Sequence, residues 1–278
     1  MVSEQTKKQR IVVKVGTSTL THDNGTLNFR NLESLARVLS DLKNKGCEIV
    51  LVTSGAIGIG IAKLGMDQKP SDLRYKQAVA AVGQCELMHL YDKFFAEYGH
   101  MVGQILLTRE DVDQKARRKN LINTFQSLLE LGVIPIVNEN DSVSFEQIES
   151  GKNKVFGDND TLSAMVAALC QADLLVFFSD IDGLYDCDPR ENPQAVLIPV
   201  VAEINDDLRR SGGGAGTKRG TGGMVTKIAA AEIAMKNGIN MVITNGSHPE
   251  ALYDILEGKP VGTLFRAPKN IQAGGLSL

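Results

Sequence analysis

The chain has 278 residues, of which 43% are hydrophobic and 23% are charged, as is usual for a globular protein. This length suits one large α/β domain, although length alone also allows two domains. The formal net charge is −3 and no long run of like charge occurs, which argues against a nucleic-acid partner.

Signals for a membrane span, a metal motif or a disulfide framework are missing from the sequence. The longest nearly apolar stretch, 164–178, contains Gln171 and Asp173 and is shorter than the ~20 residues that cross a bilayer. The four cysteines show no metal or redox spacing, and the four histidines form no metal motif. We therefore expect a cytoplasmic protein with reduced thiols, no metal motif and no membrane partner.

Strand-like and helix-like segments alternate along the chain. Short β-branched or apolar runs predict strands at 11–15, 48–53, 101–107, 134–138, 174–178 and 240–244. Apolar residues at helical spacing predict helices at 32–42, 73–98, 118–131, 164–170, 227–237 and 249–257. The alternation predicts an α/β fold with a mostly parallel sheet covered on both faces. No repeat or linker is evident, so we expect a single domain over 1–278, with a core at about 11–265 and a tail at 266–278.

Polar and glycine-rich segments follow five of the predicted strands. They lie at 16–18, 54–55, 138–141, 179–180 and 244–246. The carboxyl ends of parallel strands share one edge of the sheet, and ligands of such sheets bind outside that edge. The sequence therefore predicts a binding cleft there.

The first strand carries an unusual lysine. A lysine in the core is costly unless it reaches a partner, so we expect the ammonium of Lys14 to point to the end of the sheet. The following residues, Gly16 to Ser18, are predicted to form a tight turn. The second strand leads into another small-residue turn at 54–60, whose backbone N–H groups would approach a ligand.

Two carboxylates and an amide, Asp158, Asn159 and Asp160, come directly before an apolar run. A helix cap among residues 160–163 would place Asp158 and Asn159 in the loop ahead of a helix N-terminus, which attracts anions. For an isolated tripeptide an ordinary cap and turn would be preferred. The polar loop at 138–141 favours a binding cleft instead.

Residues 211–223 contain seven glycines in thirteen positions and lead into a predicted helix. One interpretation is a flexible loop. The other is a phosphate-binding loop at a helix start, with Lys227 as its cation. Neither the Walker A nor the Rossmann glycine spacing is present, so no generic motif identifies a nucleotide.

The charged residues suit phosphoryl transfer, which needs alignment and positive charge around the moving group. Lys14 and Lys227 would supply that charge, and Asp160 would hold both ammonium groups. Mg²⁺ would be carried by the nucleotide phosphates, because it needs few protein ligands. For a lysine taken alone a solvated surface role is the default, with Lys14 inside a strand as the exception.

The chain resembles the amino acid kinase family from about residue 11 to residue 265. The motifs occur in the order found in one branch of that family: VKVGTS (13–18), VTSGA (52–56), AVGQ (81–84), GQILLT (103–108), PIVNEND (135–141), GDNDTLSA (157–164), DGLY (182–185) with DPR (188–190), and GTGGMVTK (220–227). The resemblance implies a three-layer α/β/α sandwich. It also implies ATP-dependent phosphorylation of the γ-carboxylate of L-glutamate, which gives L-glutamyl 5-phosphate for proline biosynthesis.

The resemblance also implies roles for individual residues by motif position. The catalytic residues would be Lys14, Lys227 and Asp160. Glutamate would be bound by Ser54, Asp141, Asn159 and Asp158. ATP would be bound by Lys14, Ser179, Asp180, Thr221, Gly222, Gly223, Met224, Val225, Thr226 and Lys227. The backbone N–H groups of Gly16 and Gly55 would contact the phosphoryl oxygens.

Further expectations follow from the resemblance: a homo-oligomer, proline as a feedback inhibitor, and glutamyl phosphate reductase as the downstream enzyme. Many bacterial members carry a C-terminal PUA domain, which we expect this chain to lack. Ser179 stands where threonine is often found. Two alternatives stay open. One is a kinase of the same fold that acts on N-acetylglutamate, uridylate or carbamate. The other is a non-catalytic metabolite sensor, against which the presence of both lysines and Asp160 argues.

Overall fold

The computed structural model describes residues 8–22, 25–144, 159–211 and 223–268. Within these ranges eight strands form one sheet, in the order β3-β4-β2-β1-β5-β7-β8-β6. Paired strands are parallel except β7 and β8, which are antiparallel. The strands are β1 (Arg10–Val15), β2 (Glu48–Val52), β3 (Val102–Leu107), β4 (Ile134–Glu139), β5 (Leu174–Ser179), β6 (Val200–Val201), β7 (Asn240–Asn245) and β8 (Thr263–Phe265).

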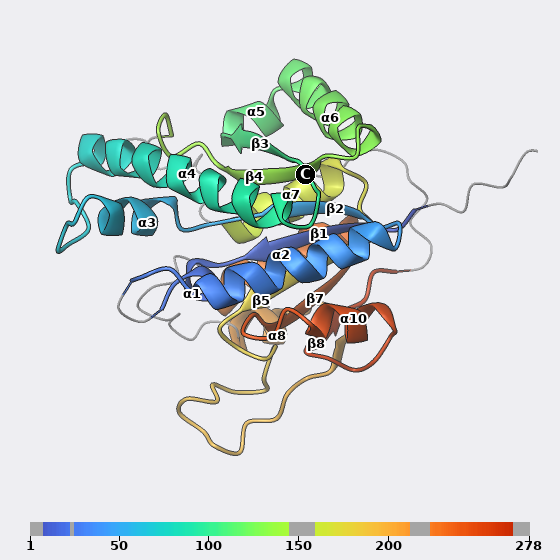
Figure 1. Ribbon diagram of the computed structural model, residues 1–278. Helices are drawn as coiled ribbons and strands as arrows, with labels where there is room; N and C mark the ends of the chain where they lie inside the picture. The colour runs from blue at the N-terminus through green and yellow to red at the C-terminus, as the bar shows by residue number, and fades with distance from the viewer. Residues whose placement is uncertain (1–7, 23–24, 145–158, 212–222, 269–278) are drawn as a thin grey trace, which may run out of the picture.

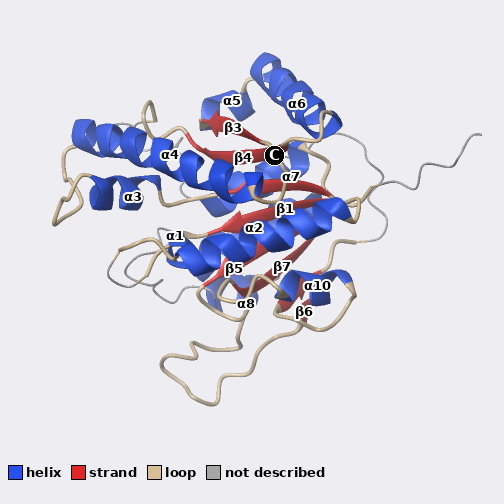
Figure 2. Ribbon diagram, in the orientation of Figure 1, coloured by secondary structure: helices blue, strands red, loops and turns tan. Residues whose placement is uncertain are grey.

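Helices cover both faces of the sheet (Figures 1 and 2). Side chains of α2, α3, α4 and α10 form an apolar cluster on one face, and those of α5, α6, α7 and α9 form one on the other. The helices are α1 (Thr17–Leu20), α2 (Phe29–Asn44), α3 (Ala56–Lys63), α4 (Leu73–Ala96), α5 (Arg109–Asp113), α6 (Lys115–Glu130), α7 (Asn159–Leu169), α8 (Asp206–Ser211), α9 (Met224–Lys236) and α10 (Ala251–Leu256). The expected three-layer sandwich with a mostly parallel sheet is confirmed.

Alternation along β1 decides where its lysine points. Successive side chains of a strand face opposite sides of the sheet. Ile11 and Val13 belong to the apolar cluster that contains α2 and α4, whereas Val12 belongs to the cluster that contains α7 and α9. Lys14 shares the face of Val12, and its Nζ lies 5.5 Å from the centre of the Phe177 ring. Its ammonium is therefore directed to the side of the sheet that α7 and α9 cover.

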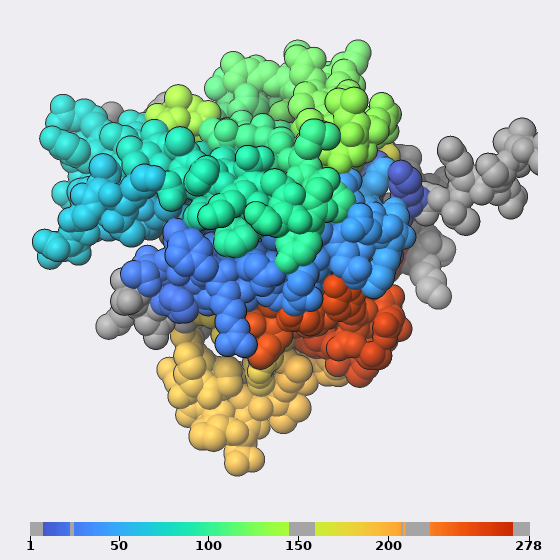
Figure 3. Space-filling model, in the orientation of Figure 1, coloured from blue at the N-terminus to red at the C-terminus, as the bar shows by residue number. Residues whose placement is uncertain are grey.

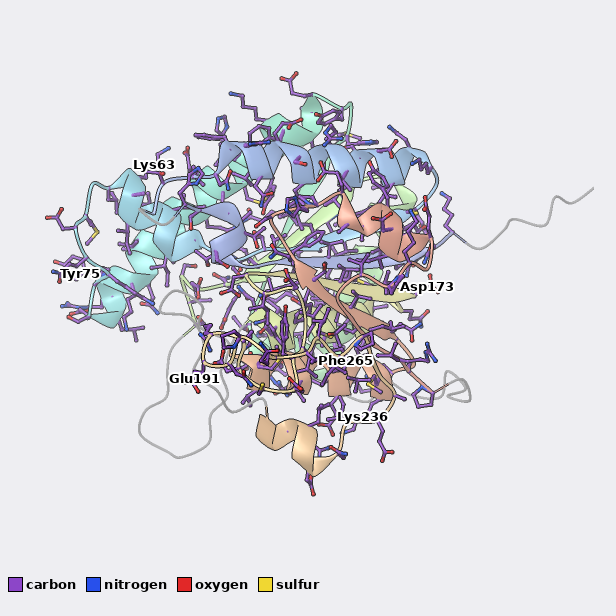
Figure 4. All side chains as sticks on the ribbon, turned by 90° about the horizontal axis from the view of Figure 1, so that it is seen from below. Lys63, Tyr75, Asp173, Glu191, Lys236 and Phe265 are labelled. Carbon is purple, nitrogen blue, oxygen red and sulfur yellow. The ribbon has the colours of Figure 1, made fainter. Side chains whose placement is uncertain are left out.

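Helix α3 and the N-terminal half of α4 form an arm that extends beyond the carboxyl edge of the sheet and projects at the left of the space-filling view (Figure 3). Lys63 and Tyr75 mark this arm in Figure 4, on the opposite side of the molecule from Asp173, which precedes β5. The helices touch through two glycines. A Cβ on Gly60 would lie 2.0 Å from the Val79 carbonyl oxygen, and a Cβ on Gly83 would lie 1.8 Å from that of Ala56.

The six predicted strands are confirmed to within one residue at each end, and the six predicted helices are present with shifted ends. Two predicted turns are wrong. The turn after β1 is a short helix, α1, and only 54–55 of the predicted turn 54–60 precede α3. The sequence pattern does not predict α5, α8, β6 or β8, because elements of two to six residues show too little periodicity. Within the described ranges, no helix has both the length and the apolarity needed to cross a membrane.

Candidate active site

Three charged side chains from separate elements meet at the carboxyl edge of the sheet. Lys14 lies near the end of β1, and Asp160 and Lys227 lie in the first turns of α7 and α9. The Nζ of Lys14 is 2.6 Å from Oδ1 of Asp160, and the Nζ of Lys227 is 3.3 Å from Oδ2. One carboxylate thus bridges two ammonium groups, which is the arrangement the sequence predicts. The catalytic roles of these residues stay predictions.

This cluster is almost completely buried. The exposed fractions of Lys14, Asp160 and Lys227 are 8%, 1% and 7%. Burial by itself raises the pKa of Asp160, but the two lysines lower it more, so the pKa lies below its usual value. Asp160 is therefore an anion between two cations, so these three described side chains together carry one net positive charge. A buried site with this balance favours an anionic ligand.

The N-terminal turn of α9 contributes a hydroxyl to the cluster. The Oγ1 of Thr226 is 2.8 Å from Oδ2 of Asp160 and 2.7 Å from the carbonyl oxygen of Gly223, the N-cap residue of the helix. Lys227 thus lies in the first turn of α9, which begins at Met224 and not at residue 227 as the sequence predicts. The backbone N–H groups at the N-terminus of α9 add partial positive charge.

The other predicted ATP-binding residues that the structure describes lie at the end of β5 and at the start of α9. Ser179 is buried at the end of β5, and its hydroxyl donates to Oδ1 of the exposed Asp180 at 3.0 Å. Met224 is half-buried and Val225 is exposed at the start of α9. Two predicted residues, Thr221 and Gly222, lie outside the described residues.

Asn159 joins three neighbouring polar groups. Its Nδ2 donates to Oγ of Ser54 at 2.8 Å and lies 3.2 Å from both the Thr53 carbonyl oxygen and Oδ1 of Asn138. The expected proximity of Ser54 and Asn159 is therefore present. Their position needs one correction: Asn159 is the first residue of α7, not part of the loop ahead of it. Helix α7 begins earlier than its apolar run does, because its first turn is polar.

Asp141 lies two residues beyond β4 and is half-buried. Burial raises the pKa of its carboxyl group, and the positive charge of Lys69 opposes that rise. Lys69 comes from the connection between α3 and α4, so the arm contributes to the electrostatics of this loop. The other predicted acidic substrate residue, Asp158, lies outside the described residues.

The two predicted glycines lie just beyond the carboxyl ends of β1 and β2. A Cβ on Gly16 would lie 3.6 Å from the Nζ of Lys14, which places this backbone beside the charged cluster. Gly55 is the N-cap residue of α3 and has φ = 95°, in the left-handed region that a side chain disfavours. Its conformation directs the N-terminus of α3 toward the carboxyl edge.

Two residues that the sequence analysis did not assign belong to the same network. Asn138, at the end of β4, contacts Asn159, and its Nδ2 donates to Oε1 of Gln84 at 2.9 Å. Both appear in motifs quoted above, AVGQ and PIVNEND. Those motifs were the available signal, but the pattern along α4 does not show that Gln84 is buried against another amide.

Comparison with known proteins identifies the family. The sequence model of the amino acid kinase family matches residues 9–245. The chain belongs to the amino acid kinase family. It is 55% identical to glutamate 5-kinase of Clostridium perfringens over 261 residues, which make up 94% of this chain and 96% of that protein. Glutamate 5-kinase of Clostridium acetobutylicum is 57% identical over 261 residues, or 94% and 95% of the two chains.

A solved structure places this amino acid kinase in the same fold. UMP kinase from Ureaplasma parvum aligns with a TM-score of 0.64 and 18% identity, over 94% of this chain and 99% of that one. At this identity the likeness shows the fold alone. Members of the amino acid kinase family are phosphotransferases, and the buried cations at the sheet edge match that class of reaction.

Proposed function

We propose that the protein transfers the γ-phosphoryl group of ATP to the γ-carboxylate of L-glutamate, giving L-glutamyl 5-phosphate as the first step of proline biosynthesis. The observation that carries this proposal is the buried Lys14–Asp160–Lys227 cluster at the carboxyl edge of the sheet. Support for glutamate comes from the two clostridial relatives, which are named glutamate 5-kinase.

The reaction needs no general base. The γ-carboxylate of glutamate has a pKa of roughly 4.3 and is ionised at neutral pH. Its oxygen attacks the γ-phosphorus of ATP, and the bond from that phosphorus to the bridging oxygen breaks as ADP leaves with the electron pair. The main barrier is the repulsion between two anions, and fixed positive charge lowers it.

The cluster supplies that positive charge. In this mechanism Lys14 and Lys227 stabilise the negative charge on the transferring phosphoryl group. Asp160 is a positioning residue, since its two oxygens hold the two ammonium groups apart. ATP approaches from the side of α9 and of Ser179 and Asp180. The backbone N–H groups of Gly16 and Gly55 donate hydrogen bonds to the phosphoryl oxygens.

The donor set fits a metal ion that arrives with the nucleotide. When bound with ATP, Mg²⁺ neutralises phosphate charge. The two oxygens of Asp160 already face Lys14, Lys227 and Thr226. Within the described residues, no group of three His, Cys, Asp or Glu side chains is placed to hold a metal ion. The protein would bind Mg²⁺ chiefly through the phosphates of ATP, because this ion needs few protein ligands.

The residues proposed to bind the substrate favour glutamate, with its free α-ammonium, over N-acetylglutamate. Asp141 and Asp158 supply carboxylates, and Asn140 and Asn159 supply amide oxygens, which suit an ammonium with three donors. N-acetylglutamate presents an amide with a single donor and adds bulk. Removing one partner of a buried charge pair costs roughly 3–5 kcal/mol. We expect a preference for glutamate of at least about two orders of magnitude, at ~1.4 kcal/mol per tenfold.

The proposal also includes the partners and the location of such an enzyme. Proline would be a feedback inhibitor that competes with glutamate. Glutamyl phosphate reductase would consume the acyl phosphate. We also propose a cytoplasmic homo-oligomer.

One assay tests the proposed function directly. ADP release is measured with ATP and Mg²⁺ in the presence of glutamate, N-acetylglutamate, UMP or carbamate, and the acyl phosphate is trapped as a hydroxamate. We expect ADP and hydroxamate to form in equal amounts with glutamate. Comparable product from N-acetylglutamate would contradict the substrate assignment. Absence of ADP release with every acceptor would favour a metabolite sensor.

A further inference from the structure

A chain of amide hydrogen bonds runs from the arm to the first residue of α7. Oε1 of Gln84, on α4, accepts from Nδ2 of Asn138 at 2.9 Å. Oδ1 of Asn138 accepts from the backbone N–H of Glu139 at 2.9 Å and from Nδ2 of Asn159 at 3.2 Å. Asn159 in turn reaches Ser54 at 2.8 Å. The chain therefore links α4 to two predicted substrate-binding residues.

Backbone groups fix the orientation of the two asparagine amides in this chain of hydrogen bonds. The N–H of Glu139 can only donate, so the Asn138 atom that faces it is oxygen, and the Asn138 nitrogen is left to face Gln84. Gln84 must then present its own oxygen. At the other end the carbonyl of Thr53 can only accept, so the Asn159 atom 3.2 Å away is nitrogen. A rotated amide at Asn138 or Asn159 would put like atoms together.

The fixed orientation leaves one acceptor of the site without a partner. Oδ1 of Asn159 is buried, and no hydrogen bond to it is found among the described residues. A buried polar atom without a partner destabilises the fold. Such an atom therefore indicates a functional site at which a ligand supplies the partner. The α-ammonium of an amino acid carries donors of the kind this oxygen lacks.

We propose that Gln84 is a positioning residue for the amino-acid substrate, a role that rests on the proposed function. By accepting from Asn138, Gln84 acts together with the Glu139 N–H to hold the Asn138 oxygen toward Asn159. With the Thr53 carbonyl, this keeps the Asn159 nitrogen toward Ser54 and leaves its oxygen available for the substrate ammonium. Gln84 is only 8% exposed. It follows Gly83, whose contact with the Ala56 carbonyl brings α4 close to the site.

Two substitutions at this position separate the role of the acceptor from that of bulk. Gln84→Met keeps the length of the side chain but offers no comparable acceptor to Asn138. We expect the KM for glutamate to rise about tenfold or more while the KM for ATP stays unchanged. Gln84→Glu restores an acceptor oxygen and is expected to recover most of the glutamate affinity. If Gln84 had only a structural role, its substitution would lower the thermal midpoint or the active fraction of the enzyme. It would not raise the KM for glutamate while leaving the KM for ATP unchanged.

A control and a mutant cycle complete the test. The control is Leu90→Ala, because Leu90 lies on the face of α4 that packs in the apolar core. This substitution is expected to lower the thermal midpoint and leave the KM for glutamate unchanged. If Gln84 acts through Asn138, the double variant Gln84→Met/Asn138→Ala binds glutamate no more weakly than Asn138→Ala alone. An unchanged KM for glutamate in Gln84→Met, or additive effects in the cycle, would overturn the inference. Failure of the proposed function is distinct, because the wild-type protein would then release no ADP with glutamate.

Discussion

Lys14 and Asp160 form a buried ion pair, with 2.6 Å between Nζ and Oδ1, although β1 and α7 are far apart in the chain. The sheet brings them together. Strand β5 follows α7 and pairs in parallel with β1, with Lys14 opposite Phe177. Helix α7 therefore returns across the face toward which Lys14 points. The position of this ion pair leads to the following expectations.

The first prediction concerns Lys227, whose ammonium lies 3.3 Å from Asp160. Lys227→Ala should lower kcat by roughly 10²-fold or more, a typical loss when one electrostatic donor to a transition state is removed. Steady-state ADP release with saturating glutamate and ATP measures the effect. Lys236→Ala is the matched control, because Lys236 lies on the same helix but is exposed and pairs with Glu232. A Lys227→Ala enzyme with near-normal kcat would refute the role.

The second prediction concerns stability and pH. The pKa of Asp160 is held below its usual value, so its stabilising effect is present above the unfolded-state pKa of about 3.9 and is lost as the pH falls through the folded-state pKa. Asp160→Asn should lower the free energy of unfolding by about 3–5 kcal/mol at pH 7, because two buried lysines lose their counter-charge. Urea titrations should show this difference shrinking below about pH 4.

The surface pair of Asp254 and Lys259 provides the control for that experiment. Asp254→Asn should lower the free energy of unfolding by less than about 1 kcal/mol, because exposed ion pairs contribute little to stability. A difference between wild type and Asp160→Asn that stays constant from pH 7 to pH 3 would contradict the linkage.

The third prediction concerns Asp141, whose pKa burial raises above its usual value. Asp141→Asn should raise the KM for glutamate about tenfold or more and leave the KM for ATP nearly unchanged, since a hydrogen bond to a charged group is worth roughly 1.5–3 kcal/mol. In the wild type, protonation of Asp141 should also weaken glutamate binding, and the raised pKa moves this loss to a higher pH than for an ordinary aspartate. The KM for glutamate should therefore rise as the pH is lowered from neutral in the wild type, and much less in Asp141→Asn.

The fourth prediction compares two glycines of α3. A Cβ on Gly60 would lie 2.0 Å from the Val79 carbonyl oxygen, whereas the nearest atom to a Cβ on Gly58 is 3.7 Å away, on the Thr17 side chain. Gly60→Ala should destabilise by about 1–3 kcal/mol or more, since the two helices must separate. Gly58→Ala should be neutral or stabilise by up to about 1 kcal/mol, because alanine favours a helix interior. Thermal unfolding of both variants decides the matter, and equal effects would show that the helices adjust freely.

The fifth prediction concerns proline. We expect it to raise the apparent KM for glutamate without lowering kcat, because both amino acids would use the oxygens near Asn159 and Asp141. Initial rates at several proline concentrations measure this. Inhibition that leaves the KM for glutamate unchanged would indicate a separate site. The stretch 142–156 connects the loop at 138–141 to the segment before α7, and its residues 145–156 lie outside the described ranges.

Much of the fold could be predicted because its strands are short apolar runs ended by polar residues. Lys14 is an example: a charged residue inside a β-branched run needs a buried partner, and Asp160 was the candidate. The elements that the sequence does not predict are those too short to show a periodic pattern. Helix α5 depends on a capping box between Thr108 and Asp111, and β8 on three residues that pair with β7.

The parts of the site that could not be predicted depend on contacts between distant segments. Gln84 appears in the sequence as one polar residue among several on α4. Only the close approach of α4 to α3 shows that it is buried against Asn138. Likewise, the start of α7 at Asn159 depends on polar contacts with Ser54 that no local pattern encodes.

The order of the strands also has a consequence for synthesis on the ribosome. Strands β1 to β4 come from the first half of the chain and form one side of the sheet, with β1 as its border strand. A nascent chain can therefore pair β3, β4, β2 and β1 before Leu174–Ser179 has been made. During that interval the other edge of β1, including the lysine at position 14, has no neighbour, and such an unpaired apolar edge promotes aggregation. The arrival of β5 closes that edge and holds α7 against β1, so Asp160 can pair with Lys14, whereas Lys227 on α9 joins the cluster only later.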